Sequence, residues 1–334
     1  MPEQPKCEPY VLTFAPILKE KVWGGRRLEG LGKTLPAGVM VGESWEIADL
    51  AATSASGGGG DAARSVITNG PLRGKTLHEA MALWGLSLLG TATPSAEGGF
   101  PLLVKFLDAR EHLSVQVHPS PAYARTHPGA HLKTECWFVL EAEPGSVIYK
   151  GVKPGVTRTD FERALRDGQG GGVVELLDAV SAVVGECHNL PSGTVHALGA
   201  GVLVAEVQTP SDTTFRVYDW AKEYGRSSRE LHIEQALACI DFAPAAKAVR
   251  APAETGITQL VTTEFYSVTV LGSGSSMPIE GGRCLVVVGV EGTTTITPES
   301  RTATELARGS VALVPAGVRG RIAADAWGLV FQLG

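Results

Sequence analysis

Short apolar runs, bounded by Gly and Pro, dominate the middle and the end of the chain. Runs of about four to eight residues that are rich in Val, Ile, Phe and Tyr are typical of β-strands. The segments with this pattern are LLVKFLDA, LSVQVHP, ECWFVLEA, SVIYKGV, GVLVAEVQ, TFRVYDW, FYSVTVLG, CLVVVGV and SVALVPAG. Because these strands are short and closely spaced, the pattern predicts an antiparallel barrel or jelly roll and not a parallel sheet with crossover helices.

Three other segments have the apolar period of an amphipathic helix. Each begins with Thr or Ser three residues before Glu, the spacing at which the two residues satisfy each other's free backbone amides. The pairs are Thr76 with Glu79, Thr159 with Glu162, and Ser227 with Glu230. We therefore expect a helix to begin at each pair, the second to end near Gly168, and all three to be insertions around a β-barrel.

A change in composition after Asp241 divides the chain. The segment APAAKAVRAPAETG is rich in Ala and Pro and has no apolar period, and strand-like runs resume after it. We place a domain boundary near residue 245, between a domain of residues 1–244 and a smaller β-barrel of residues 245–334. The segment SASGGGGDAA, residues 54–63, is predicted to be a flexible surface loop, because so much Gly is costly to order.

Composition and charge exclude several classes of protein. The 334 residues include 29 Lys and Arg against 35 Asp and Glu, a net charge of −6, so no global basic field favours nucleic acid or an anionic membrane. No run of about 18 uncharged apolar residues is present. The first residues, MPEQPKCEPY, lack the basic flank and apolar stretch of a signal peptide. These features predict a cytoplasmic protein without a nucleic-acid or membrane partner.

Polar residues two positions apart share one face of several middle strands, because successive side chains of a strand point to opposite faces. The pairs are Gln116 with His118, Lys133 with Glu135, and Thr194 with His196. A Gln oxygen and an imidazole on one face can bind a metal, but for this segment taken alone a hydrogen-bonded pair on a solvated face is the favoured explanation of Gln116 and His118. Lys133 and Glu135 could form a surface ion pair, but the apolar residues after Glu135 indicate a buried strand, in which a carboxylate needs a partner such as a metal ion.

Two more charged residues follow. Glu206 is a single charge in the apolar row of Val202 and Val204, and burial should raise the pKa of its carboxyl unless a cation is near, as in many general bases. Arg216, expected on the same face as Tyr218 and Trp220, could supply that cation or bind a phosphate through two hydrogen bonds.

Taken in their order along the chain, these segments resemble the type I phosphomannose isomerases, a zinc-dependent cupin family. The matching strings are VWGGRRL, GESWEIAD, KFLDAREHLSVQVHP, KTECWFVL, PSGTVHALGAG and EVQTPSDTTFRVYDW, within residues 10–240. In the C-terminal part, GSVALVPAGV resembles a cupin turn. The resemblance implies a mainly β fold of two jelly-roll barrels, a bicupin, with helical insertions; residues 1–244 would form the catalytic, metal-binding cupin domain.

The resemblance also implies site residues. Its metal ligands, the Gln and His of QVHP, the Glu of KTE and the His of GTVHA, correspond here to Gln116, His118, Glu135 and His196. This set of nitrogen and oxygen donors suits Zn²⁺ and leaves positions for water or substrate. The family's functional Lys, Glu and Arg correspond to Lys133, Glu206 and Arg216. A basic residue soon after the YDW string would be Lys222 or Arg226, and Trp23, Glu43 and Trp45 would either line the pocket or serve packing and a turn.

The activity implied by the resemblance is that of a mannose-6-phosphate isomerase, acting on a phosphorylated hexose through a cis-enediol, with Glu206, Lys133 or a water on the zinc as the base. A noncatalytic cupin that binds or senses a phosphosugar is the alternative. An iron-dependent cupin oxygenase is less compatible, because a site of two His and one carboxylate would leave Gln116 unexplained. The domain of residues 245–334 is expected to be metal-free, because it contains no His and one Cys. The sequence does not determine the oligomeric state.

Overall fold

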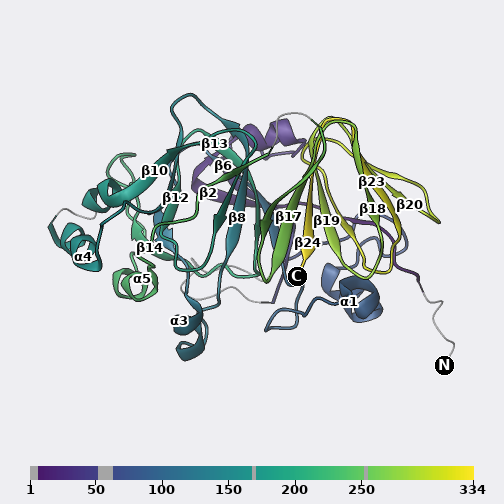
Figure 1. The fold of residues 1–334 in the computed structure, drawn as a ribbon, viewed down its shortest axis with the longest axis horizontal. Coiled ribbons are helices and arrows are strands. Elements are labelled where there is room, and N and C mark those ends of the chain that lie inside the picture. The colour runs from purple at the N-terminus through teal and green to yellow at the C-terminus, as the bar shows by residue number, and fades with distance from the viewer. Residues whose placement is uncertain (1–6, 52–62, 168–170, 252–254) are drawn as a thin grey trace.

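Four antiparallel β-sheets lie one behind another along the longest axis of the molecule (Figure 1). The computed structural model describes residues 7–51, 63–167, 171–251 and 255–334. Apart from Ala63, the Gly-rich loop predicted at residues 54–63 lies outside these residues. The predicted mainly β, cupin-type architecture with small helical insertions is confirmed.

Within the described residues, the first barrel is built from a seven-stranded and a five-stranded sheet. The seven-stranded sheet contains, in spatial order, β15 (Val249–Arg250), β11 (Glu186–Leu190), β8 (Glu135–Ala142), β13 (Val202–Gln208), β6 (Leu103–Ala109), β3 (Val41–Ile47) and β2 (Ile17–Gly25). The five-stranded sheet contains β10 (Leu177–Ser181), β9 (Val147–Val152), β12 (His196–Leu198), β7 (Val115–Val117) and β14 (Phe215–Tyr218).

The second barrel follows in the yellow-green half of Figure 1. Its larger sheet contains β1 (Leu12–Thr13), β22 (Val311–Val314), β19 (Leu285–Glu291), β24 (Trp327–Leu333), β17 (Tyr266–Leu271) and β16 (Ile257–Thr262). Its smaller sheet contains β18 (Ser275–Ile279), β23 (Gly320–Ala324), β20 (Thr294–Pro298) and β21 (Thr304–Leu306), and β4 (Asp49–Leu50) pairs separately with β5 (Ala63–Arg64).

Strand β8 shows how the apolar pattern divides the two interiors. Cys136 and Phe138 belong to a core cluster shared with strands of the second barrel, whereas Trp137 and Val139 belong to a cluster inside the first barrel. Neighbouring residues of a strand point to opposite faces, so a strand buried on both faces reads as a continuous apolar run. The run CWFVL, residues 136–140, is therefore continuously apolar because the seven-stranded sheet is covered on both sides.

The two barrels share main-chain pairing as well as a core. Strand β1, from the N-terminal part of the chain, pairs with β22 of the second barrel, and β15, from residues after 245, pairs with β11 of the first barrel. The predicted division at residue 245 stays a prediction. Burying one continuous core between the two large sheets couples the stability of one barrel to the other.

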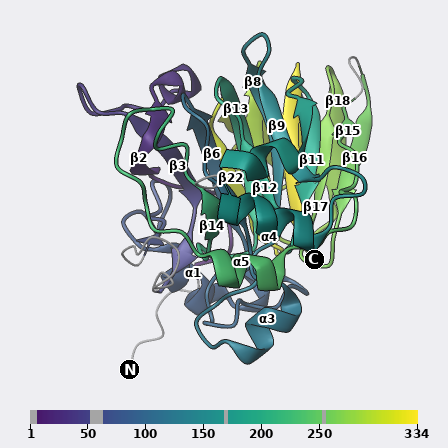
Figure 2. The same cartoon turned by 90° about the vertical axis from the view of Figure 1, so that its left-hand side faces the viewer.

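Helical segments connect the strands. They are η1 (Arg27–Leu31), α1 (Leu77–Trp84), α2 (Leu86–Leu89), α3 (Pro121–Thr126), α4 (Arg158–Asp167), η2 (Gly171–Leu176) and α5 (Ile233–Cys239). Figure 2 shows that α3 and α5 lie at the same end of the first barrel. No helix in the described part of the chain is long and apolar enough to cross a membrane.

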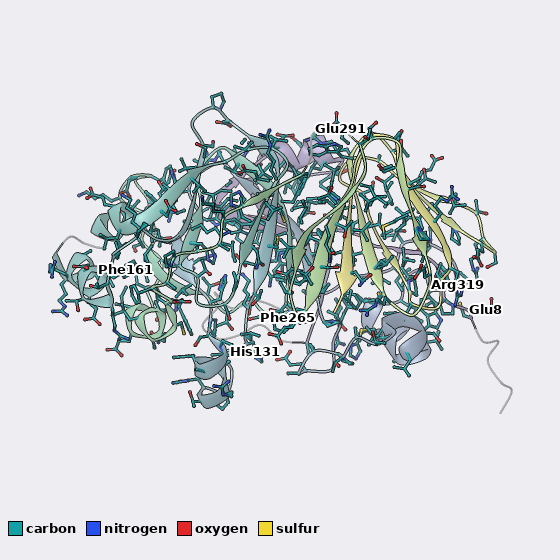
Figure 3. The ribbon with its side chains drawn as sticks, viewed as in Figure 1. Glu8, His131, Phe161, Phe265, Glu291 and Arg319 are labelled. Atoms are coloured by element: carbon teal, nitrogen blue, oxygen red, sulfur yellow. The ribbon has the colours of Figure 1, made fainter. Side chains whose placement is uncertain are left out.

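The predicted helix starts were correct in one case of three. Thr76 caps α1 and forms the expected reciprocal pair with Glu79. The cap of α4 is Thr157, whose hydroxyl accepts from the amide of Asp160, so this helix begins earlier than the pair of Thr159 and Glu162 predicted. Phe161 of this helix lies at the outer end of the first barrel in Figure 3, where it is buried and packs against Phe242.

The third predicted start was also wrong. Helix α5 begins at Ile233 without a side-chain cap, and Ser227 and Glu230 precede it in irregular backbone. The main chain there is held by other partners: the amide of Arg229 donates to Asp219, and the carbonyl of Glu230 accepts from Arg216. These tertiary contacts take the place of a capping box.

Candidate active site

A cavity of about 160 Å³ opens inside the first barrel, between its two sheets. Its charged lining residues are Lys19, Lys21, Glu43, Lys105, Lys133, Glu206, Asp212, Arg216 and Arg229, and its aromatic lining residues are Trp23, Trp45 and Trp137. The structure therefore brings Lys133, Glu206 and Arg216, predicted from distant segments, to one cavity. It also places Trp23, Glu43 and Trp45 in the wall, as one of their two interpretations had suggested.

Three buried side chains beside this cavity converge in a way that could hold a metal ion. The two carboxylate oxygens of Glu135 lie 3.2 Å from His118 Nε2 and 3.0 Å from His196 Nε2. His118 Nε2 and both Glu135 oxygens are buried and form no hydrogen bond of regular geometry among the described residues; their close polar contacts are one another, His196 Nε2 and Lys133 Nζ. Buried polar atoms normally have partners, so this group has unused capacity for a ligand.

The backbone fixes the orientation of both imidazoles. His118 Nδ1 lies 2.9 Å from the carbonyl oxygen of Thr213, and His196 Nδ1 lies 2.8 Å from that of Thr194. When Nδ1 donates its hydrogen to a carbonyl, the lone pair of Nε2 is left free for a metal. Burial, reinforced by the nearby Lys133 ammonium, lowers the pKa of His118 to about 3, which keeps this imidazole neutral.

Local sequence explains how these side chains reach one point. Strand β7 ends at Val117, and Pro119, which has no amide hydrogen to donate, stops it just after His118. Gly193, in the turn before β12, has φ of 90°, a conformation that other residues rarely adopt. Its amide donates to the carbonyl of His118, so the turn that leads to His196 is tied to the other imidazole.

Gln116 lies at the edge of the group. Its backbone is directly opposite that of His196 on the neighbouring strand, and its Nε2 is 3.4 Å from His196 Nε2. The amide oxygen points instead toward Ser114, whose hydroxyl donates to it at 3.3 Å. As a metal ligand, Gln116 would need its amide turned over, a rotation about one side-chain bond.

Lys133 and Glu206 link this group to the cavity. Lys133 Nζ lies 2.7 Å from a Glu135 oxygen; although burial alone would raise the pKa of the Glu135 carboxyl, the Lys133 ammonium holds that pKa well below its usual range. Glu206 accepts from Trp137 Nε1 at 2.9 Å. Burial raises the pKa of the Glu206 carboxyl, the direction expected from the sequence.

The cation nearest Glu206 is Lys105, which the sequence analysis did not select. Lys105 Nζ lies 3.1 Å from a Glu206 oxygen and 3.8 Å from a Glu43 oxygen, and it is almost fully buried. Burial disfavours its charge, but the two carboxylates hold the pKa of Lys105 above its usual value. The signal was available, because Lys105 is a lone charge between Leu103 and Leu107 on one strand face, the argument used for Glu206.

Arg216 faces the cavity, but Tyr218 and Trp220 do not share its face as predicted. A register shift in β14 lies between Arg216 and Tyr218, and Tyr218 and Trp220 pack in the apolar cluster of Val217. Burial, together with the nearby Arg229, lowers the pKa of Arg216 to about 10. A bulge of this kind turns side chains that simple alternation would keep on one face.

The two candidates for the basic residue after the YDW string lie outside the lining of the cavity. Lys222 is exposed and Arg226 pairs with Asp219 and Glu111, and neither lines the cavity. Arg229 does line it, although its spacing from YDW had not suggested it.

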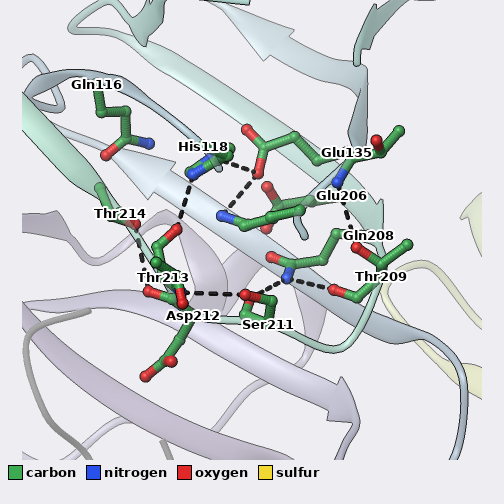
Figure 4. Close-up of polar contacts among 12 residues, drawn as sticks. Gln116, His118, Glu135, Glu206, Gln208, Thr209, Ser211, Asp212, Thr213 and Thr214 are labelled. Atoms are coloured by element: carbon green, nitrogen blue, oxygen red, sulfur yellow. Dashed lines mark hydrogen bonds and ion pairs between the residues drawn. The ribbon is translucent and has the colours of Figure 1, made fainter. Parts of the chain in front are cut away.

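Figure 4 shows the polar contacts of residues 208–214 beside His118 and Glu135. The side-chain amide of Gln208 donates to the carbonyls of Thr209 and Ser211. The Thr209 hydroxyl donates to the carbonyl of Leu132, and the Ser211 hydroxyl donates to that of His131. Residues 209–214 include Thr213, whose carbonyl oxygen contacts His118 Nδ1, and are thus tied to the loop that carries Lys133.

His131 itself lies apart, near α3 in Figure 3, with its Nε2 3.4 Å from a Glu97 oxygen.

Known proteins resemble this chain in sequence and structure. A family model described as the catalytic domain of type I phosphomannose isomerase matches residues 11–145. The chain is 38% identical over 235 residues to the mannose-6-phosphate isomerase ManA of Bacillus subtilis (strain 168), covering 69% of this chain and 68% of that protein. It is 37% identical over 253 residues to the mannose-6-phosphate isomerase of Streptococcus mutans serotype c, covering 75% and 73%. A crystal structure of the mannose 6-phosphate isomerase from Bacillus subtilis aligns with a TM-score of 0.79 at 29% identity, over 96% of this chain and 99% of that chain.

Proposed function

Since this chain belongs to the type I phosphomannose isomerase family, a family of aldose–ketose isomerases, we propose that it interconverts mannose 6-phosphate and fructose 6-phosphate. The resemblance indicated by the sequence is thereby confirmed. The observation that carries the proposal is the buried group of His118, Glu135 and His196 beside a cavity lined by Lys133, Glu206 and Arg216.

The metal in this proposal is zinc, held by His118, Glu135 and His196, with Gln116 as the fourth ligand after its amide turns. The donor set fits: two imidazoles, one carboxylate and one amide oxygen are ligands that zinc accepts, and the His118 Nε2 and Glu135 carboxylate atoms already face one another. When bound, zinc would act as a Lewis acid that polarises the oxygens on the two reacting carbons.

The isomerisation moves a proton between two adjacent carbons through a cis-enediol, so it needs a base that faces the cavity. We assign this role to Glu206, because Trp137 and Lys105 hold its two oxygens in place beside the cavity. Lys133, as an ammonium 2.7 Å from Glu135, has no lone pair to accept a proton; it would donate a hydrogen bond to a substrate oxygen. Arg216 is assigned to the phosphate, because guanidinium binds phosphate through two hydrogen bonds.

The direct test is to incubate the purified protein with mannose 6-phosphate, with and without a chelator, and to measure fructose 6-phosphate. We expect product to form, to disappear after chelation and to return when zinc is restored. Saturable binding of mannose 6-phosphate without turnover, in zinc-loaded protein, would favour the noncatalytic sugar-binding alternative. Turnover that persists in metal-free protein would overturn the assignment of the metal.

A further inference from the structure

Three arginines gather around one buried carboxylate at the side of the cavity formed by β14. Asp219 accepts from Arg226 Nη1 at 2.9 Å and from Arg229 Nε at 2.7 Å, and Arg229 Nη2 also contacts it. The backbone amide of Arg229 donates to the same carboxylate at 2.9 Å. Because Asp219 binds the Nε and Nη2 edge of the Arg229 guanidinium, the planar fork presents its Nη1 edge away from Asp219.

Arg216 is held next to Arg229 by the same segment. Arg216 Nη1 donates to the carbonyl of Glu230 at 2.8 Å, and the backbones of Arg216 and His232 bond to each other. The Arg216 Nε is buried without a hydrogen-bond partner among the described residues and lies 3.9 Å from Asp219. The structure therefore keeps two like charges side by side in the wall of one cavity, and one of them has an unused donor.

The opposite wall is different, because three of its four lysines contact a carboxylate, and the fourth, Lys19, lies over the Trp45 ring. Lys21 pairs with Glu43, Lys105 with Glu206, and Lys133 with Glu135. On the arginine side, Arg216, Arg226 and Arg229 share Asp219, and Asp212 also lines this end of the cavity. Two adjacent guanidinium groups that share one carboxylate are suited to an anion with several oxygens, which can accept from both forks.

We propose that Arg229 is the second arm of an anion clamp with Arg216, that it binds the phosphate monoester of the substrate, and that Asp219 is the residue that positions it. This inference rests on the proposed function for the identity of the phosphate ester, whereas the clamp itself is a property of the cavity. Arg216 and Gln116 are direct partners on the neighbouring strands β14 and β7, so one arm of the clamp lies beside one of the proposed metal ligands.

The test compares Arg229→Gln with Lys247→Gln, which removes one exposed positive charge outside the lining of the cavity. The probe is inorganic phosphate, used as a competitive inhibitor and in calorimetric titration of the zinc-loaded protein. For Arg229→Gln, we expect the KM for mannose 6-phosphate and the inhibition constant of phosphate to rise together by about tenfold or more, as for the loss of one charged hydrogen bond. Lys247→Gln should change neither by more than about twofold, because exposed charges are screened.

Asp219→Asn tests the positioning role. It leaves both arginines in the chain but removes the charge that orients Arg229, so the KM for mannose 6-phosphate and the inhibition constant of phosphate should both rise. Arg229→Lys should restore little of the binding that Arg229→Gln loses, because an ammonium cannot make the same paired contact. Unchanged phosphate binding in Arg229→Gln, or equal losses in Arg229→Gln and Lys247→Gln, would overturn the clamp. If the wild-type protein binds phosphate in an Arg229-dependent way but does not isomerise mannose 6-phosphate, the clamp stands and the proposed function fails.

Discussion

Replacing Lys105 with Met tests whether this residue holds the charged cavity wall together. Its Nζ lies 3.1 Å from Glu206 and 3.8 Å from Glu43. At an effective dielectric constant of about 20, these distances correspond to attractions of about 5 and about 4 kcal/mol. Much of this gain offsets the several kcal/mol spent in desolvating the buried groups, so the net loss on removing one partner should be about 3 kcal/mol.

The expected loss of stability arises mainly because the carboxylates of Glu206 and Glu43 stay buried after Lys105 is removed. Without Lys105, Glu206 keeps a single donor, Trp137, and the pKa of its carboxyl should rise further above its usual value. Adding Glu206→Gln to Lys105→Met removes that unpaired charge and should restore at least half of the lost stability. Recovery of this size would show that the stability lost in Lys105→Met comes from the broken ion pair. A loss of packing around the lysine stem would not be recovered by the second substitution.

Urea unfolding gives the free energies, with a chelator present throughout so that differences in metal affinity do not contribute. Lys75→Met is the matched control, because Lys75 pairs with Glu79 on an exposed helix face and should cost less than about 0.5 kcal/mol. A loss below about 1 kcal/mol for Lys105→Met, or no recovery in the double variant, would refute the reasoning.

Four further outcomes follow from the site. Glu135→Gln and His118→Ala should both lose zinc and activity while the circular dichroism of the fold is retained, and elemental analysis showing full zinc in either variant would remove that residue from the ligands. Arg216→Lys should keep zinc but lose at least about tenfold in kcat/KM, because a point charge cannot replace a planar fork; near-normal kinetics would return Arg216 to a structural role. The pKa of Glu43 is lowered to about 2 from 4.5 despite its burial, chiefly by Lys21. The ionised carboxylate therefore stabilises the fold above pH 4.5, and this contribution is lost as the pH falls from 4.5 toward 2. Glu43→Gln should make the free energy of unfolding depend less on pH over that range. The whole chain should bind one equivalent of zinc, because all eight His lie at or before His232, and a second tightly bound equivalent after dialysis would contradict this count.

The sequence predicted those features that depend on local periodicity. Alternation placed Lys133 and Glu135 on one strand face, and the structure finds them in contact. It also identified Glu206 as a single charge in an apolar row, and the structure places this carboxylate, buried, in the lining of the cavity. The capping pair of Thr76 and Glu79 formed as expected, since both partners are within one helical turn.

Features that depend on distant partners were decided only by the tertiary structure. The capping pair of Ser227 and Glu230 did not form. Instead, Asp219 accepts a hydrogen bond from the backbone amide of Arg229, and Arg216 donates one to the backbone carbonyl of Glu230. The same contacts turn Arg229 toward the cavity, where no spacing rule had placed it.

By itself, then, the sequence determined the mainly β class, the family and the short segments, each at the end of a strand, that contain His118, Glu135 and His196, because periodicity and motif order are written in consecutive residues. It did not determine which cation meets Glu206, which arginine lines the cavity, or that β1 and β15 cross between the barrels. Those outcomes depend on pairing between strands far apart in the chain and on burial of charges that must find partners, and both are settled only when the sheets pack.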